Sequence, residues 1–157
     1  MKLRNFFFKK GKLMPLTRND PDGWFVTTRF FKILYRVPKE NLREKLKSII
    51  TDDIKCNFQA EQEKDSFSLK GRKEFLNFWV DNWAKSASKR METKLVSMNS
   101  RLIGHNNYVV EVTVLQKHDE KQYLIASEQY FQLRKVGDDF KIENLRMIRL
   151  SKEEIKT

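Results

Sequence analysis

Residues 122–150 read QYLIASEQYFQLRKVGDDFKIENLRMIRL, and their pattern gives the clearest indication of the fold. Apolar side chains recur at every second position along much of it, which is the period of a β-strand. Val136-Gly137-Asp138-Asp139 interrupts the pattern with residues that favour a tight turn. The stretch therefore predicts two long antiparallel strands, 122–135 and 140–150, joined by a hairpin.

The same period continues upstream of this hairpin. Side chains alternate at residues 91–98, and residues 108–116 are rich in valine, which favours strands. Gly104-His105-Asn106-Asn107 carries residues that tolerate positive φ and reverses the chain between the two runs. A second turn is expected at residues 117–120. The second half of the chain thus predicts four long antiparallel strands.

The first half is predicted to be mainly helical. Pro21 suits the first position of a helix, and Asp20 can accept hydrogen bonds from the free N–H groups there. An apolar face follows as far as Tyr35. Pro38 ends this helix, because the residue before a proline avoids the helical conformation. Helical spacing of apolar residues then predicts a second helix that extends from Pro38 to Ile50.

Residues 51–53 are expected to form a turn, followed by a short hairpin whose strands contain Cys56 and Leu69. Gly71 then leads into a third helix, on which aromatic side chains share one face because they recur every three or four residues: Phe75, Phe78, Trp79 and Trp83. This order of elements predicts an α+β fold, with three helices from the N-terminal half packed in a curved antiparallel sheet. We expect a basic N-terminal arm at residues 1–19 and a single domain at residues 20–157.

The order of elements resembles the nuclear transport factor 2-like superfamily, which includes ketosteroid isomerase-like and polyketide cyclase-like proteins. The resemblance covers about residues 20–150 and rests on these features: Phe30-Phe31 and Leu34 in the first helix, the strand entry at residues 53–56, Gly71 before the third helix, and the hairpin at residues 133–142. Phe140 stands where many members have tryptophan. The resemblance implies a cone-shaped α+β barrel with a cavity between sheet and helices, and dimers through the outer sheet face. It carries over no catalytic residue, because no catalytic motif of the family is matched.

The composition restricts the classes of partner and compartment. The net charge of +11 permits binding to nucleic acid, a ribosome or an anionic membrane surface, although no aromatic and basic signature of nucleic-acid recognition accompanies it. No apolar run approaches the roughly 20 residues of a membrane-spanning helix. The single cysteine, Cys56, excludes an internal disulfide and favours an intracellular, cytoplasmic location. The basic arm leaves a mitochondrial presequence as the alternative.

Polar residues that interrupt apolar strand faces predict a small hydrophobic-ligand pocket. Ser127 and Gln129 interrupt one strand, and Asn144 and Arg146 interrupt the next. Together with three aromatic residues of the helices, they form the candidate pocket: Tyr35, Trp79, Trp83, Ser127, Gln129, Asn144 and Arg146. The alternative is a β-bulge near Asn144, which would turn Asn144 or Arg146 into solvent.

The long strands are apolar on both faces, whereas a half-solvated antiparallel sheet has one polar face. A homodimer or heterodimer through the outer sheet face would cover the second apolar side. The candidate dimer face is Val109, Leu115, Leu124, Ala126, Tyr130, Leu145 and Met147. The basic arm is the alternative cover.

No catalytic or metal-binding pattern stands out. Both histidines, His105 and His118, fall in predicted turns, and with one cysteine they do not supply a tetrahedral metal set. Asp52, Asp53 and Glu128 are the acidic residues that could face a cavity. We therefore expect no metal and no cofactor, and the catalytic residues stay unknown. The first hypothesis is a non-catalytic ligand- or protein-binding domain, the second a small-molecule isomerase, dehydratase or cyclase-like enzyme, and the third a basic adaptor.

Overall fold

The computed structural model describes residues 21–60, 63–88 and 91–156, with the side chains of residues 21–22, 36, 63 and 83–88 left out. The predicted basic arm and Asp20 lie outside these residues. The helices are α2 (Pro21–Arg36), α3 (Lys39–Lys47) and α4 (Gly71–Ser88), and a short 3₁₀ turn, η2, spans Glu63–Asp65. The strands are β1 (Ile50–Gln59), β2 (Phe67–Lys70), β3 (Met91–Gly104), β4 (Asn107–His118), β5 (Lys121–Val136) and β6 (Asp139–Ile155).

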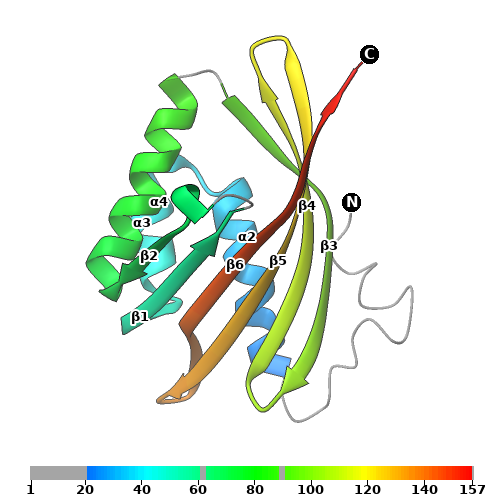
Figure 1. The fold of residues 1–157 in the computed structure, drawn as a ribbon. Helices are drawn as coiled ribbons and strands as arrows, with labels where there is room; N and C mark the ends of the chain where they lie inside the picture. The colour runs from blue at the N-terminus through cyan, green and yellow to red at the C-terminus, as the bar shows by residue number, and fades with distance from the viewer. Residues whose placement is uncertain (1–20, 61–62, 89–90, 157) are drawn as a thin grey trace.

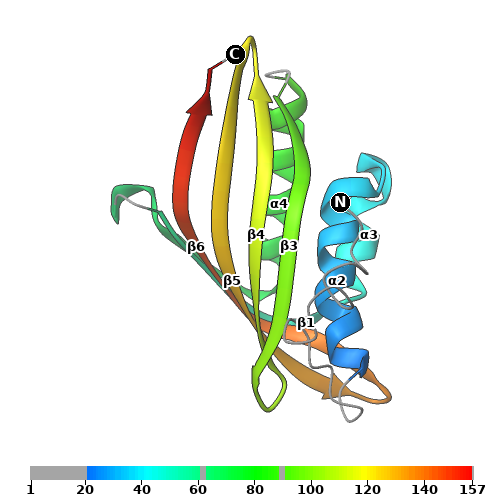
Figure 2. The same cartoon turned by 90° about the vertical axis from the view of Figure 1, so that its right-hand side faces the viewer.

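One six-stranded sheet, in the order β2-β1-β6-β5-β4-β3, forms the framework of the fold. Figure 1 shows the three helices on one side of this curved sheet, and Figure 2 shows the four long strands side by side. We call the side that faces the helices the inner face and the other side the outer face. The predicted α+β class, with three helices of the first half against a curved sheet, is confirmed. The sheet is mixed, however, because β1 pairs with β6 in parallel.

The predicted turn at residues 51–53 is wrong, because these residues belong to β1. Ile50, expected in the second helix, is the first residue of this strand. The backbone N–H of Ile142 donates a hydrogen bond of 2.8 Å to the carbonyl of Ile49, which starts the pairing with β6 at this point. The residues predicted to form a turn instead lie where the pairing of β1 with β6 is irregular, between Ile50 and Lys55.

Gly71 joins β2 directly to α4 with a φ of +84°, a conformation that residues with a Cβ rarely adopt. The backbone N–H of Lys70 donates a 2.7 Å hydrogen bond to the carboxylate of Glu74, one turn into the helix. This contact satisfies a free donor at the helix N-terminus. Arg72 and Asp52 form an ion pair that connects α4 to β1. The sharp strand-to-helix connection is thus fixed by a glycine and two polar contacts.

Aromatic rings join the helical layer to the inner face of the sheet. The ring of Phe30, on α2, contacts those of Phe131 on β5 and Trp79 on α4, with centroids 5.5 and 5.9 Å apart. Phe31 contacts Phe131 as well, at 5.7 Å. Phe30 and Phe131 are almost fully buried, at 0% and 1% exposure. These edge-to-face contacts fill the centre of the core.

A β-bulge in β6 determines which of its side chains face the helices. Leu133 pairs with Ile142 and Gln132 with Asn144, so Glu143 is an extra residue with no partner on β5. Its carboxylate accepts hydrogen bonds of 2.8 Å from the side chains of Gln132 and Arg134. From this residue to Arg149, the alternation of side chains along β6 is shifted by one position, and a second extra residue, Leu150, follows.

The bulge is also connected to β1 through Arg134. A guanidinium nitrogen of Arg134 lies 3.0 Å from a carboxylate oxygen of Asp53. This hydrogen bond is the main cause that holds the pKa of Asp53 below its usual value, and the contacts with Asp53 and Glu143 raise the pKa of Arg134. Three strands therefore meet in one charged contact on the outer side.

Replacement of a central ring should strongly destabilise the fold. We expect Phe30→Ala to lower the free energy of unfolding by about 3–5 kcal/mol, because it removes buried apolar surface and leaves a cavity. Phe25→Ala is the matched control, because Phe25 lies on the same helix and is 56% exposed. It should change the free energy by less than about 1 kcal/mol. Urea denaturation of both variants measures the difference, and equal losses would contradict the assigned core.

Loss of Arg134 should raise the pKa of Asp53. In Arg134→Gln we expect this pKa to move up toward about 3.9, the value of a free aspartate, as followed by NMR titration of its carboxyl carbon. A carboxylate with a depressed folded pKa stabilises the fold above its unfolded pKa, and this stabilisation is lost as the pH falls through the folded pKa. The wild type should therefore lose more stability than the variant between about pH 4 and the lower pKa. An unchanged Asp53 titration in the variant would contradict the contact.

Candidate functional site

Two of the predicted pocket residues, Ser127 and Gln129, lie on the inner face of β5 as expected. The register continues from each onto the neighbouring strands: Gln129 pairs with Val110, which pairs with Ser100, and Ser127 pairs with Val112. Ser100 and Gln129 are buried, at 4% and 8% exposure. We call Ser100 and Gln129 the inner polar pair. Val110, on the strand between them, separates the two residues.

The inner polar pair has polar atoms without a protein partner in the described part of the chain. These atoms are the Ser100 hydroxyl oxygen and the Gln129 carbonyl oxygen. The indole N–H of Trp79 on α4 also lacks a hydrogen-bond partner there. Buried polar groups normally find a hydrogen-bond partner in protein or in ordered water. The inner side therefore holds donors and acceptors that a water molecule or a small polar group could satisfy.

Tyr35, also predicted for the pocket, packs against the core at the C-terminal end of α2. Burial raises the pKa of its phenol to about 12, so the hydroxyl stays protonated at neutral pH. Trp79 contacts Phe30, Phe75 and Phe78 and is part of the ring cluster. The side chain of Trp83 lies outside the described residues. The inner side is thus mainly aromatic and apolar.

The acidic residues and histidines considered from the sequence do not enter the inner side. Asp52 and Asp53 are exposed and pair with Arg72 and Arg134. His105 is exposed in the turn between β3 and β4. His118, at the end of β4, is 3.7 Å from the carboxylate of Asp119, a neighbour in the adjoining turn. The buried polar residues of the described chain are Thr27, Thr28, Thr51, Ser100 and Gln129.

Asn144 and Arg146 were predicted to line the inner pocket, but they lie on the outer face. The bulge at Glu143 shifts the alternation, so Leu145 and Met147 point inward, and both belong to the hydrophobic core with exposures of 0% and 4%. The placement of Leu145 and Met147 on the outer face was therefore wrong. The alternative with a bulge near Asn144 is the arrangement that the structure adopts.

The other members of the candidate dimer face lie on the outer side of β4 and β5. Val109 pairs with Tyr130 and Leu115 with Leu124. Leu115, Leu124, Ala126 and Tyr130 are half-buried, whereas Val109 is 1% exposed although it is outside the core cluster. The outer face thus presents half-buried apolar side chains on β4 and β5.

Two rows of side chains cross the centre of the outer face. The acidic row consists of Asn99, Glu111, Glu128 and Ile148, taken from β3 to β6. The arginine row, next to it, consists of Arg101, Val109, Tyr130 and Arg146. The guanidinium of Arg146 lies 5.9 Å from the centre of the Tyr130 ring. Because cross-strand neighbours are about 5 Å apart, Glu111 and Glu128 bring two negative charges together.

Within the described residues, no ion pair or side-chain hydrogen bond is formed by Glu111, Glu128 or Arg101. The guanidinium of Arg146 donates a 3.4 Å hydrogen bond to the side-chain oxygen of Gln59. The acidic row was not predicted from the sequence. Alternation along residues 108–116 gives the outward position of Glu111, but only the register shows that Glu128 lies opposite it.

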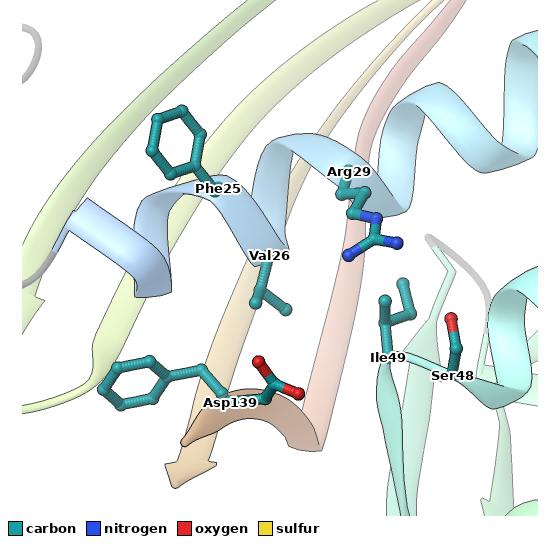
Figure 3. Close-up of a pocket in the computed structure, with 7 residues that line it drawn as sticks. Phe25, Val26, Arg29, Ser48, Ile49 and Asp139 are labelled. Carbon is teal, nitrogen blue, oxygen red and sulfur yellow. The ribbon is translucent and has the colours of Figure 1, made fainter.

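Two pockets lie outside the inner polar pair. The first, of about 300 Å³, is on the outer face, where Ile103 and Tyr130 meet a group of amide and guanidinium side chains from three strands: Asn107, Gln132, Asn144 and Arg146. The second, of about 210 Å³, lies between α2, the α3–β1 connection and the start of β6 (Figure 3). Asn144 and Arg146 thus line a pocket, though not the one that was predicted.

No helix in the described part of the chain is long and apolar enough to cross a membrane.

No protein-family model and no curated protein matches the sequence significantly. Solved structures do match. A protein with a cystatin-like fold from Caulobacter vibrioides is 12% identical, with 82% of this chain and 90% of that chain covered and a TM-score of 0.59.

Two further structures show the range of proteins that share this architecture. The yeast UBP3-associated protein BRE5 is 16% identical over 87% of this chain and 98% of its own, with a TM-score of 0.54. A candidate scytalone dehydratase from Novosphingobium aromaticivorans is 11% identical over 85% and 88%, with a TM-score of 0.55. At these identities the likeness concerns the fold alone. The resemblance seen in the sequence is confirmed at that level: the chain has the nuclear transport factor 2-like fold.

Proposed function

We propose that this chain is a non-catalytic protein-binding domain that pairs with a second copy of itself through the outer sheet face. The observation that supports a non-catalytic role is the aromatic filling of the inner side. Phe30, Phe131 and Trp79 occupy the space between helices and sheet, where an enzyme of this fold would hold its substrate.

A proton-transfer enzyme needs an acid or base in a dry site, with a pKa suited to its task. Among the described residues, no Asp, Glu or His is buried. The groups whose pKa is raised by burial are the Tyr35 phenol and the Cys56 thiol, each to about 12, and both stay protonated at neutral pH. The inner side therefore favours binding over catalysis.

The outer face supports a second copy as partner, because its charges are self-complementary. In a two-fold pairing whose axis runs across the strands between the two rows, the acidic row of one copy lies over the arginine row of the other. Adjacent strands are about 4.8 Å apart. Glu111 is then one strand away from Arg101 of the second copy, and Glu128 one strand away from Arg146 of the second copy.

The same pairing would bury the apolar part of the face. Tyr130 of each copy lies over Glu128 of the other, next to Val109. Leu115 and Leu124 form a more distant row, beyond the row of Thr113 and Ala126. An isologous interface of this kind uses one patch twice. The four charges of each copy, which have no ion pair within the described residues, then form pairs without a second binding surface. The heterodimer is the alternative, in which a different chain supplies the matching charges.

Charge reversal tests this pairing. Sedimentation equilibrium should show wild-type dimers, whereas Glu111→Arg with Glu128→Arg, or Arg101→Glu with Arg146→Glu, should each weaken self-association by about tenfold or more through like-charge repulsion. An equimolar mixture of the two double variants should form heterodimers. Glu40→Arg with Glu44→Arg, both exposed on α3, changes the net charge as much as the first double variant does, and as the matched control it should leave association unchanged.

A wild type that stays monomeric at the highest soluble concentration would overturn the homodimer. A wild-type dimer that both double variants also form would move the interface away from these rows.

A small polar ligand on the inner side is the second candidate, and the inner polar pair favours it. A candidate scytalone dehydratase shares this fold, so the same architecture occurs in a protein named as an enzyme. Ser100 and Gln129 would then supply hydrogen bonds to a group that enters the cone.

The Gln129→Met variant distinguishes the two states of this site. If the Gln129 carbonyl has no partner, an apolar side chain of similar size should leave the free energy of unfolding unchanged or raise it. If a retained ligand or water satisfies the carbonyl, the variant should lose about 1–2 kcal/mol. Chemical denaturation of the purified protein measures this difference, and we expect the unchanged or raised value.

A further inference from the structure

The pocket between α2 and the start of β6 is a narrow slot on the helical side of the molecule, away from the outer face. Its volume is about 210 Å³. Three elements contribute side chains: α2, the α3–β1 connection and the beginning of β6. The residues of the slot are Phe25, Val26, Arg29, Ser48, Ile49, Asp139 and Phe140.

The base of the slot is apolar. Val26 and Ile49 are buried, at 8% and 2% exposure, and Phe140 is half-buried against the core. Phe25 stands at the rim with 56% of its surface exposed, although its neighbours Trp24 and Val26 are both buried. The Phe25 ring contacts that of Trp24, with centroids 5.3 Å apart, and extends the apolar surface of the slot to its rim.

Opposite charges stand on the two walls of the slot. Figure 3 shows the Arg29 guanidinium, on α2, and the Asp139 carboxylate, at the start of β6, directed toward the same gap. Neither side chain has an ion pair or a hydrogen bond within the described residues. The Ser48 hydroxyl donates to the carbonyl of Lys45 and keeps its oxygen free to accept. The slot therefore offers one unpaired cation, one unpaired anion and an apolar base.

We propose that the slot binds a peptide segment of a partner protein, which inserts one large apolar side chain between Phe25 and Phe140. The segment carries an acidic residue on the side of Arg29 and a basic residue on the side of Asp139. This site is separate from the outer-face pairing and does not depend on it.

Size and charge favour this occupant over others. Pockets for drug-sized ligands and cofactors usually measure about 300–1,000 Å³, so the slot accommodates one side chain rather than a whole cofactor. A phosphate or nucleic-acid backbone would meet Asp139 on one wall, which repels it. A peptide satisfies both walls, because its side chains can place an anion and a cation on either side of an apolar anchor, as in the centre of many protein interfaces.

Capped heptapeptides test the proposal. The probes are Ala-Glu-Ala-Leu-Ala-Lys-Ala and its reversed order Ala-Lys-Ala-Leu-Ala-Glu-Ala, with versions that carry serine at the centre or glutamine at both flanks. Binding is followed by NMR shifts of the Val26 and Ile49 methyl groups in the full chain. We expect one leucine peptide to bind about two- to fivefold more tightly than the glutamine version, as exposed ion pairs allow. It should bind roughly tenfold more tightly than the serine version, which lacks the anchor.

The decisive variant is Arg29→Glu with Asp139→Lys, which exchanges the two charges. It should invert the preference between the two peptide orders while the leucine requirement persists. Phe25→Ser should weaken both peptides, and Leu150→Ser, which changes another exposed apolar residue with 52% exposure, is the matched control. All four changed residues are exposed, and thermal unfolding verifies that each variant is folded.

Failure of every peptide to shift the slot methyl groups would overturn the proposal. The same holds if the serine peptides bind as tightly as the leucine peptides, or if the charge exchange leaves the preferred order unchanged. Saturable binding of a single-stranded oligonucleotide at the same methyl groups, without peptide binding, would assign the slot to a different class of partner.

Discussion

The extra residue Glu143 in β6 is the constraint on which both faces of the sheet depend. Its carboxylate is held by Gln132 and Arg134, and Arg134 continues to Asp53 on β1. With this bulge, Ile142 and Leu145 both point toward the helices, although they are three residues apart. In a regular strand, residues three apart point to opposite faces. Without the bulge, Leu145 and Met147 would leave the core, and Asn144 and Arg146 would enter it.

The bulge therefore connects the stability of the domain to its proposed role. It assigns the apolar residues of β6 to the ring-filled interior, next to Phe131, which contacts Phe30 and Phe31. It assigns Arg146 to the outer face, where this residue lies over Tyr130 and completes the arginine row. One local irregularity thus places Leu145 and Met147 in the interior and Arg146 on the outer surface, where the proposed partner would bind.

The sequence predicted the elements well and the site less well, for a physical reason. Period-two alternation and turn residues located the four long strands, and Pro38 and Gly71 located the helix boundaries, because these signals depend on local conformation. The faces of β6 depend on where an extra residue is inserted, and a single insertion reverses every later assignment. Leu145, Met147, Asn144 and Arg146 were misplaced together for that reason. Ser127 and Gln129 lie on β5, whose own alternation is unbroken because the extra residues of this pairing are on β6, and they face inward as expected.

The two proposed contact surfaces lie on different sides of the molecule and can be occupied at the same time. The acidic and arginine rows are on the outer face of β3–β6, whereas the slot is formed by α2, the α3–β1 connection and the start of β6. They share β6, but the slot uses its first residues and the rows use residues beyond the bulge. A domain that pairs through one side and holds a peptide on the other would present two slots per dimer. Two weak peptide sites in one assembly raise the effective concentration of the second after the first is bound. Such a domain needs no buried acid or base, and its aromatic interior has only to hold the two surfaces in place.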